Sequence, residues 1–390
     1  MSTRESYSIL DILSRVEQLR ATGRKIINLS IGEPDFNTPE FIKIAAIKAL
    51  NDNLTKYTPV SGVLSLKKAI CNKLWNDNNL LYSPEQILVS SGVKHSLYNF
   101  FLSLLKPNDE VIIPTPYWLS YPSMVSLHKA KPVLVPTSLH QGYKITPEHL
   151  LAAITPKTKL FILNSPNNPT GTVYTLAELK ALAEILLEHP KIWIASDDIY
   201  EKIIWATEPF NNILNACLDL SIRTVVFNGV SKSHAMTGWR IGYAAGSKDI
   251  INAMSTVQSE SVGNSNSIAQ IASVAAINGS QTCVDEMRNV YKDRHQYLYE
   301  ELCKLPKINC HKASGAFYLF PDVSQWYHLS SEITNDIDLT EYLLTTVGVA
   351  VVPGSVFGEP NCIRISFCAN KQELEAGVQK LKIAYKALSR

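Results

Sequence analysis

The sequence lacks the features that mark disulfide-stapled, secreted and membrane-spanning proteins. Its seven cysteines are an odd number without regular spacing, and the closest pairs, Cys303 with Cys310 and Cys362 with Cys368, do not have the spacing of metal ligands. We therefore expect buried free thiols, no disulfide framework and no bound metal. No apolar run reaches the ~18 residues of a membrane helix. The start MSTRESYSIL has no apolar signal core, so the protein is expected in the cytoplasm.

The sequence also lacks an excess of charge of either sign. Lys and Arg number 37 and Asp and Glu 35, a formal net charge of +2, and Lys and Arg form no long run. Nucleic acid and membranes are therefore not expected as partners. The motifs H-E-x-x-H, G-x-G-x-x-G and the Walker loop are absent as well, which removes the usual signatures of zinc proteases, dinucleotide enzymes and P-loop enzymes.

What the chain does contain is enough apolar sequence for a large core. Of its 390 residues, 46% are apolar, which favours one large domain and a smaller one. Short, fully apolar runs alternate with helical patterns, which predicts an α/β fold with a parallel sheet covered on both faces. The predicted strands lie at residues 111–113, 160–163, 192–195, 225–227 and 241–245, and the predicted helices at residues 91–106 and 175–189.

The pattern changes at about residue 280. A long amphipathic helix over residues 284–302 precedes an apolar run at 347–352, a strand around Ile363 and a terminal helix from Lys371. We predict a large domain over residues 35–280 and a smaller α+β domain over residues 281–390, which residues 1–34 join.

Polar residues after the predicted strands are candidates for a binding site, since ligands bind beyond the carboxyl ends of strands in such sheets. Lys232 follows a predicted buried strand directly. Poor solvation there would lower its pKa, as an amine nucleophile requires, although a surface lysine is the commoner outcome. Asp197 ends another strand and either pairs with a ligand or caps a helix. Arg240 could bind an anion as a fork, whereas Arg364, within a predicted strand, could simply face solvent.

The segment Ser91–Lys94 opens a predicted helix and has two interpretations. Free backbone N–H groups and the helix dipole would make a phosphate cradle around Gly92. The same residues spell S-x-x-K, the signature of serine β-lactamases and penicillin-binding proteins. That hydrolase would also need S-D-N and K-T-G motifs, which are absent, so we favour the phosphate cradle.

Taken together and in this order, the motifs resemble the fold-type-I, class I aminotransferases that use pyridoxal phosphate, in particular the subgroup that resembles aspartate aminotransferase. The resemblance runs from about residue 26 to about residue 387. It implies a large domain with a mostly parallel sheet of the seven-stranded type covered by helices, and a smaller α+β domain. It rests on the segments 31–36 (IGEPDF), 56–59 (KYTP), 116–118 (PYW), 165–171 (SPNNPTG), 196–200 (SDDIY), 231–242 (SKSHAMTGWRIG), 315–318 (GAFY) and 364–366 (RIS).

The resemblance also implies a cofactor, pyridoxal 5'-phosphate, and a role for each matching residue. Lys232 would be the Schiff-base lysine, whose freed amine then moves the substrate α-proton, and Asp197 would pair with the pyridinium nitrogen. The other implied cofactor contacts are Tyr200 and Asn168 at the phenolic oxygen, Trp118 on the ring, and Gly92, Val93, Lys94, Ser231 and Arg240 at the phosphate. The implied substrate contacts are Arg364 at the α-carboxylate, with Gly32, Trp118, Asn168 and Lys94 around it. Tyr57 would reach the phosphate of a neighbouring subunit, which implies a homodimer with shared sites.

The substrates implied are an amino acid and a 2-oxo acid, and the choice of amino acid depends on Lys94. Relatives that use aspartate carry a lysine there, so its charge would pair with a distal carboxylate and favour aspartate with 2-oxoglutarate. Alternatively, Lys94 serves only the phosphate or faces solvent. Aminotransferases for alanine, aromatic amino acids or kynurenine, and a carbon–sulfur lyase, share the fold and stay open as alternatives. A DNA-binding regulator is not favoured, because only about 25 residues precede the matching region.

The sequence departs from the family pattern at two places. Asp198 stands where relatives usually have Glu, at a position that we expect to point away from the cofactor. The segment before Ile31 is shorter than in many relatives and lacks their usual proline-serine entry. The presence of an N-terminal arm that clasps the dimer therefore stays open.

Overall fold

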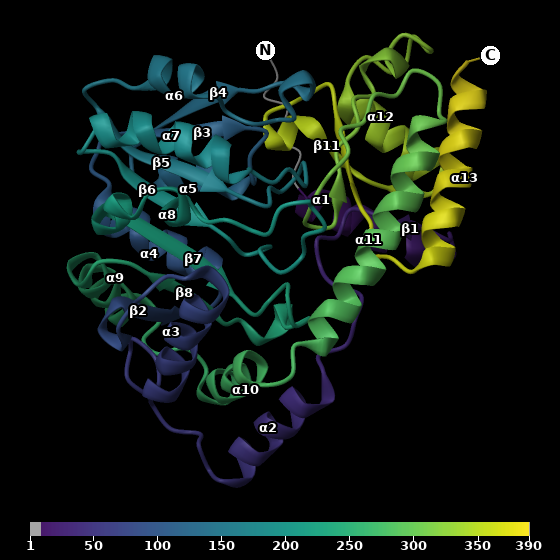
Figure 1. Ribbon diagram of the computed structural model, residues 1–390. Helices are drawn as coiled ribbons and strands as arrows, with labels where there is room; N and C mark the ends of the chain where they lie inside the picture. Colours follow the sequence, from purple (N-terminus) through teal and green to yellow (C-terminus); the bar gives the residue numbers. More distant parts are fainter. Residues whose placement is uncertain (1–8, 390) are drawn as a thin grey trace.

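The computed structural model of the protein describes residues 9–389. Its main feature is a seven-stranded sheet in the order β2-β8-β7-β6-β5-β3-β4, with helices on both sides (Figure 1). Strands β4, β3, β5, β6 and β7 pair in parallel, and β8 is antiparallel to both β7 and β2. The predicted α/β fold is confirmed. The strands are β2 (Ile87–Ser90), β3 (Glu110–Thr115), β4 (Lys131–Pro136), β5 (Thr158–Asn164), β6 (Trp193–Asp197), β7 (Thr224–Gly229) and β8 (Gly242–Ala245).

The central strands are buried on both faces because successive side chains enter different core clusters. In β3, Val111 packs into one cluster and Ile112 into the other, and Leu160 and Phe161 of β5 do the same. This explains why the strands form continuous apolar runs rather than alternating ones. The Ile112 face is covered by α3 (Leu64–Asn78), α6 (Pro147–Ala153), α7 (Leu176–Glu188), α8 (Ile213–Ala216) and α10 (Ser267–Asn278), and the Val111 face by α4 (Val93–Leu104), α5 (Ser120–Leu127) and α9 (Lys248–Ser261).

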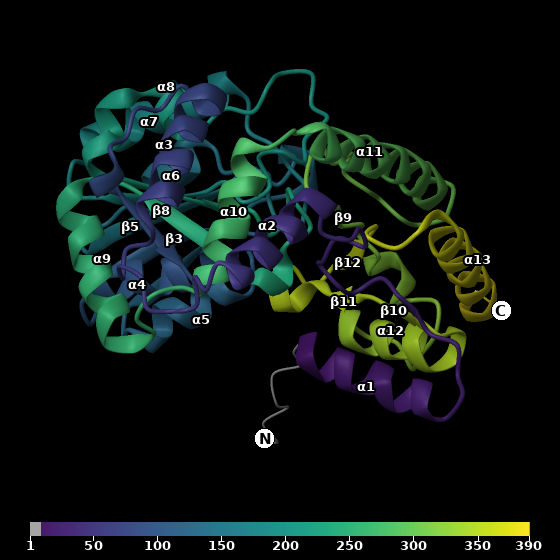
Figure 2. The ribbon, with the colours of Figure 1, turned by 90° about the horizontal axis from the view of Figure 1, so that it is seen from below.

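A second group of elements has a core cluster of its own. A three-stranded antiparallel sheet in the order β11-β12-β9 lies beside α11, α12 and α13 (Figure 2). The elements are β9 (Tyr318–Leu319), β11 (Val352–Pro353), β12 (Ile363–Ser366), α11 (Thr282–Cys303), α12 (Asp336–Tyr342) and α13 (Lys371–Leu388). The N-terminal part of the chain joins this group. β1 (Ile27–Asn28) pairs in parallel with β10 (Val349–Ala350), and α1 (Ile9–Ala21) packs Ile12 and Val16 into a cluster with Val352.

The domain boundaries at residues 34/35 and 280/281 stay a prediction, and residues 1–8 of the predicted small domain lie outside the described residues. Within residues 9–389, no helix is long and apolar enough to cross a membrane. All seven cysteines are free thiols. The expectation that they are buried is wrong for most of them, because only Cys362 and Cys368 are buried and Cys303, at the end of α11, is exposed.

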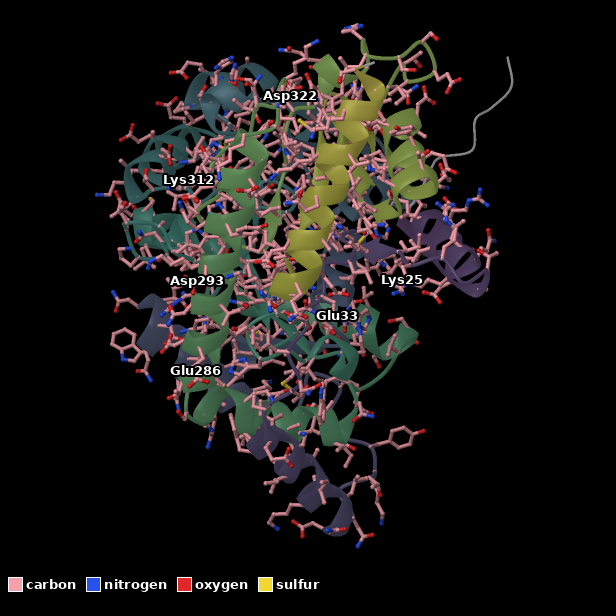
Figure 3. All side chains as sticks on the ribbon, turned by 90° about the vertical axis from the view of Figure 1, so that its right-hand side faces the viewer. Lys25, Glu33, Glu286, Asp293, Lys312 and Asp322 are labelled. Carbon is pink, nitrogen blue, oxygen red and sulfur yellow. The ribbon has the colours of Figure 1, made fainter. Side chains whose placement is uncertain are left out.

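Helix α11 illustrates how sequence periodicity places one face in the core. Val284, Met287 and Tyr291 recur three or four residues apart and are buried, whereas Glu286 and Asp293 on the other face are exposed (Figure 3). The helix therefore presents a charged side to solvent and an apolar side to β9 and β12. This packing fixes the two strands that carry part of the candidate site.

Candidate active site

The carboxyl ends of the parallel strands meet at a cavity of about 310 Å³. Asn164 ends β5, Asp197 ends β6 and Lys232 follows β7, and all three line the cavity. Of the residues predicted from the sequence, it is lined by Gly32, Val93, Lys94, Trp118, Asn168, Asp197, Tyr200, Ser231, Lys232, Arg240 and Arg364. Gly92 lies beside it, because a Cβ at Gly92 would come within 2.3 Å of Arg240 Nη2. Tyr57 does not line the cavity, and its side chain is 97% exposed.

Lys232 extends from the loop after β7 into the cavity. Its ammonium donates to the Gly32 carbonyl at 2.7 Å and lies 6.0 Å from the ring centre of Tyr200 and 5.8 Å from that of Phe317. Burial lowers the pKa of Lys232 to about 8. The amine is therefore poorly solvated, and its uncharged form is far more accessible near neutral pH than that of an ordinary lysine.

Asp197 is buried at the end of β6, with its carboxylate towards the cavity. Tyr121 of α5 donates its hydroxyl proton to Asp197 Oδ2 at 2.6 Å. Burial raises the pKa of Asp197 to about 6, while the hydrogen bond from Tyr121 and the charge of Lys232 act in the opposite direction. The neighbouring Asp198 does not line the cavity. It accepts hydrogen bonds from Ser196 and Asn212, and burial raises its pKa to about 8.

The N-terminus of α4 forms an anion cradle at one end of the cavity. Gly92 is the N-cap residue with φ 88°, and the first-turn N–H groups of Val93 and Lys94 have no partner within the helix. A Cβ at Gly242 would lie 2.3 Å from the nitrogen of Val93, so only glycine fits there. Arg240 brings a guanidinium to the same end, donating from Nη1 to the Thr237 carbonyl at 2.9 Å. An anion of phosphate size would meet backbone donors, a helix dipole and a cation.

Lys94 adds a second cation beside an aromatic ring. Its ammonium lies 5.2 Å from the ring centre of Trp118, and both residues line the cavity. Burial, followed by the charge of Arg240, lowers the pKa of Lys94. An anionic ligand group in this position would act against both effects and raise the pKa of Lys94 again.

Arg364 lies on β12 with its side chain in the cavity wall, only 3% exposed. Its Nη1 donates to Asn168 Oδ1 at 3.0 Å and its Nη2 to the Ser30 carbonyl at 2.7 Å, while Nε has no partner among the described residues. A buried charged donor without a partner is costly. The arginine is therefore poised to bind an anionic ligand group, and the possibility that it faces solvent is excluded.

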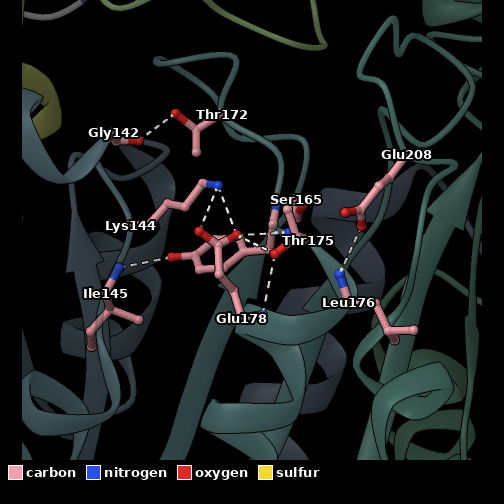
Figure 4. Close-up of polar contacts among 10 residues, drawn as sticks. Gly142, Lys144, Ile145, Ser165, Thr172, Thr175, Leu176, Glu178 and Glu208 are labelled. Atoms are coloured by element: carbon pink, nitrogen blue, oxygen red, sulfur yellow. Dashed lines mark hydrogen bonds and ion pairs between the residues drawn. The ribbon is translucent and has the colours of Figure 1, made fainter.

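The loop after β5, which carries Asn168, is held by a network of hydrogen bonds. Thr175 forms a capping box with Glu178 at the start of α7, and Lys144 donates to both carboxylate oxygens of Glu178 at 2.9 and 2.8 Å (Figure 4). Thr172 donates to the Gly142 carbonyl at 2.8 Å. Asn168 itself is fixed by its backbone N–H, which donates to Asn164 Oδ1 at 3.0 Å. The loop thus presents the Asn168 amide in one orientation.

Several cavity residues were not predicted from the sequence, notably Tyr121, Tyr318 and Ser30. Tyr121 lies shortly after the segment PYW, and Tyr318 is the last residue of the segment GAFY. Closeness to segments that carry the resemblance was the only sequence signal for these two residues. Nothing in the sequence alone shows that Tyr121 contacts Asp197, because the contact joins α5 to β6. Ser30 contributes its backbone carbonyl, which has no sequence signature.

This fold and site define an enzyme of the α/β class with an anion cradle, a poorly solvated lysine and a buried carboxylate in one cavity. The family described as aminotransferase class I and II matches residues 24–381. The chain belongs to this family, and it is an aminotransferase.

Relatives and solved structures agree with this assignment over nearly the whole chain. An aspartate/prephenate aminotransferase of Nitrosomonas europaea is 47% identical over 95% of this chain and 95% of its own length. An aspartate aminotransferase of Geobacillus stearothermophilus is also 47% identical, over 95% of this chain and 94% of its own length. The crystal structure of the aspartate aminotransferase from Rhizobium meliloti has a TM-score of 0.95 at 40% identity, covering 98% of this chain and 97% of that one. An aspartate aminotransferase from Thermus thermophilus with maleate has a TM-score of 0.91 at 37% identity, covering 97% and 96%.

Proposed function

We propose that the cavity binds pyridoxal phosphate through Lys232 and that the enzyme transfers the amino group of aspartate to 2-oxoglutarate. The proposal rests on one observation: Lys232, Asp197 and Arg364 line the same cavity. Lys232 follows β7, Asp197 ends β6 and Arg364 lies on β12. The names of the relatives, which include aspartate and aspartate/prephenate aminotransferases, support the choice of substrate.

The residues present fit the cofactor. The cradle at Gly92, Val93 and Lys94, with Ser231 and Arg240, would hold the phosphate, since a Cβ at Gly92 would fill the space beside Arg240. Asp197 would face the ring nitrogen and Trp118 would stack on the ring. Tyr200 and Asn168 would donate to the phenolic oxygen. When bound, pyridoxal phosphate supplies an electron sink for the carbanion formed at the substrate α-carbon.

Lys232 would serve first as the covalent anchor and then as the base. The amine attacks a carbonyl carbon only when uncharged, and its pKa of about 8 makes the uncharged form accessible near neutral pH. Released by the incoming amino acid, Lys232 Nζ would take the proton from the substrate α-carbon. Asp197, buried and held by Tyr121, would keep a proton on the ring nitrogen through its negative charge.

Two cations would select a dicarboxylic substrate. Arg364 would bind the α-carboxylate with donors that Asn168 and Ser30 orient, and its unpartnered Nε is a further donor. Lys94 would pair with the distal carboxylate. Alanine and aromatic donors would leave Lys94 without an anionic partner, so aspartate and glutamate gain an interaction that the others lack.

The enzyme would act as a homodimer with shared sites. Tyr57 is 97% exposed, and α2 (Glu40–Asn51) turns Ile44, Ile47 and Leu50 outward at 57%, 55% and 53% exposure. An apolar helix face of this kind supports a protein interface over a solvent surface. This helix face lies shortly before Tyr57 in the chain. Together they favour a second copy of this chain as the partner, with Tyr57 of each copy at the phosphate site of the other.

Borohydride reduction of the yellow enzyme followed by peptide mapping tests the anchor. We expect a pyridoxyl group on Lys232, and an adduct on another residue, or none, would overturn the proposal. A panel of donors with 2-oxoglutarate tests the substrate. A higher kcat/KM with alanine, kynurenine or tyrosine than with aspartate would refute the aspartate assignment, and release of ammonia and pyruvate from cystathionine would reveal a lyase.

A further inference from the structure

Tyr318 links the two halves of the site. Its hydroxyl lies 2.9 Å from the hydroxyl of Tyr200, and the two rings meet edge to face at 82°. The guanidinium carbon of Arg364 lies 4.5 Å from the centre of the Tyr318 ring. The Tyr318 side chain therefore contacts Arg364, which we propose binds the substrate α-carboxylate, and Tyr200, which we propose binds the cofactor. All three side chains are buried.

The backbone fixes Tyr318 in this position. It lies on β9, where it pairs with Ser366 of β12, the strand that carries Arg364. A Cβ at Gly32 would come within 2.2 Å of the Tyr318 hydroxyl oxygen, so Gly32 closes over that oxygen. Because β9 and Gly32 confine the ring, the hydroxyl of Tyr318 is directed at Tyr200.

The direction of the hydrogen bond follows from the other contact of Tyr200. If Tyr200 donates its only proton to the phenolic oxygen of the cofactor, its own oxygen can still accept a proton. Tyr318 is then the donor of the pair. Burial raises the pKa of both hydroxyl groups, and the charge of Arg364 opposes burial at both, so each hydroxyl keeps its proton near neutral pH and can donate it.

We propose that Tyr318 is a positioning residue whose hydroxyl donates to Tyr200 and directs the Tyr200 proton at the cofactor, while its ring supports Arg364. The inference deepens the proposed function and rests on it. The hydroxyl acts on the cofactor end of the site and the ring on the substrate end. The two roles are separable, because a phenylalanine keeps the ring and removes only the hydroxyl.

The hydroxyl has a measurable consequence. Hydrogen bonds in a chain polarise one another, so the donation from Tyr318 strengthens the donation from Tyr200. A stronger donor at the phenolic oxygen of the bound cofactor would make that oxygen a poorer acceptor for a proton on the Lys232 nitrogen. That proton is therefore lost at lower pH, and removing the Tyr318 hydroxyl should raise the pKa of the spectral transition of the loaded enzyme.

The first test is a spectrophotometric pH titration of the holoenzyme and of its variants. We expect Tyr318→Phe to raise the midpoint by roughly half a pH unit to one unit, the effect of one hydrogen bond. Tyr200→Phe should raise it further, and the double variant should not exceed Tyr200→Phe, because Tyr318 acts only through Tyr200. Tyr327→Phe is the matched control, since Tyr327 donates to the Pro360 carbonyl at 2.8 Å and does not line the cavity.

The second test separates the ring from the hydroxyl through binding of succinate, a dicarboxylate that cannot react. Tyr318→Phe should bind succinate within about twofold of the wild type, and Tyr318→Leu should bind it roughly 2- to 30-fold more weakly, the range of a cation–π contact. Tyr318→Met replaces the leucine variant if the latter does not fold.

The outcomes distinguish this inference from the proposed function. Tyr200→Phe could shift the midpoint of the spectral transition while Tyr318→Phe leaves it at the wild-type value. That result would overturn the role of the Tyr318 hydroxyl but not the proposed function. Equal succinate affinity of the phenylalanine and leucine variants would overturn the role of the ring. A wild type that takes up no cofactor on Lys232 would overturn both the inference and the proposed function.

Discussion

Arg364 donates a hydrogen bond from Nη1 to the side-chain oxygen of Asn168 at 3.0 Å, which joins β12 to the loop after β5. The contact has two consequences for the proposed mechanism. It would orient the guanidinium towards the substrate, and it turns the amide nitrogen of Asn168 away from Arg364, where that nitrogen could donate to the cofactor. One shared hydrogen bond would thus set both the proposed substrate contact and the proposed cofactor contact.

Asn168→Asp should impair every substrate alike. The new carboxylate would occupy the Arg364 guanidinium and compete with the α-carboxylate, which all amino acids carry. We expect kcat/KM to fall about 10- to 150-fold, the equivalent of a charge-assisted hydrogen bond of ~1.5–3 kcal/mol, for aspartate and alanine alike. Steady-state kinetics with both donors measure it, and Asn76→Ala on α3, an exposed asparagine, is the control. A loss confined to aspartate would contradict the assignment of Arg364.

Lys94→Gln should act on dicarboxylates alone. The glutamine keeps a polar side chain beside Trp118 but removes the charge that would pair with the distal carboxylate. We expect the ratio of kcat/KM for aspartate to that for alanine to fall about 10-fold or more. Lys180→Gln, an exposed lysine on α7, should leave the ratio unchanged. An equal fall for both donors would assign Lys94 to the phosphate alone.

Much of this site was predictable from the sequence because of one regularity. Asp197 ends a parallel strand and Asn168, Tyr200 and Lys232 follow such strands, whose carboxyl ends meet at one edge of the sheet. Tyr318 was beyond this reasoning, since its contacts with Tyr200 and Arg364 depend on how the second group of elements packs on the first. Pairing across separate elements has no local signature, whereas strand ends and helix N-termini do.

Tyr121→Phe should move the acid limb of the pH–activity profile upward. The hydrogen bond from Tyr121 to Asp197 lowers the pKa of a carboxyl that burial raises to about 6, so its loss raises that pKa further. Asp197 would then take up a proton at a higher pH and lose the negative charge proposed to hold the ring nitrogen protonated. We expect a shift of roughly half a unit to one unit in kcat/KM against pH. An unmoved acid limb would show that Asp197 does not control it. Tyr327→Phe is the control.

The pH dependence of cofactor uptake should report the pKa of Lys232. Only the uncharged amine attacks the aldehyde, so the rate rises with pH while the amine is protonated and levels off above its pKa. Because burial lowers that pKa to about 8, we expect the rate to reach half of its maximum near pH 8 and to level off about one pH unit higher, when cofactor-free protein is mixed with pyridoxal phosphate and followed by absorbance. An ordinary lysine would still gain rate up to about pH 10. A continued rise through pH 9.5 would therefore show that the amine is well solvated in the free protein.

An inactive variant and an impaired one should restore activity to each other if the sites are shared. Lys232→Ala lacks the anchor, and Tyr57→Ala lacks the contact that we assign to the partner's phosphate site. In a mixed dimer, one site then carries both defects and the other carries none. Random pairing makes half of the dimers mixed, so about one quarter of all sites should be intact. Unfolding and refolding the two variants together, with limiting pyridoxal phosphate, should recover about a quarter of the wild-type activity. Each variant refolded alone is the control. If Tyr57 served only its own subunit, every mixed dimer would have one site without the anchor and one without Tyr57, and the mixture would be no more active than Tyr57→Ala refolded alone.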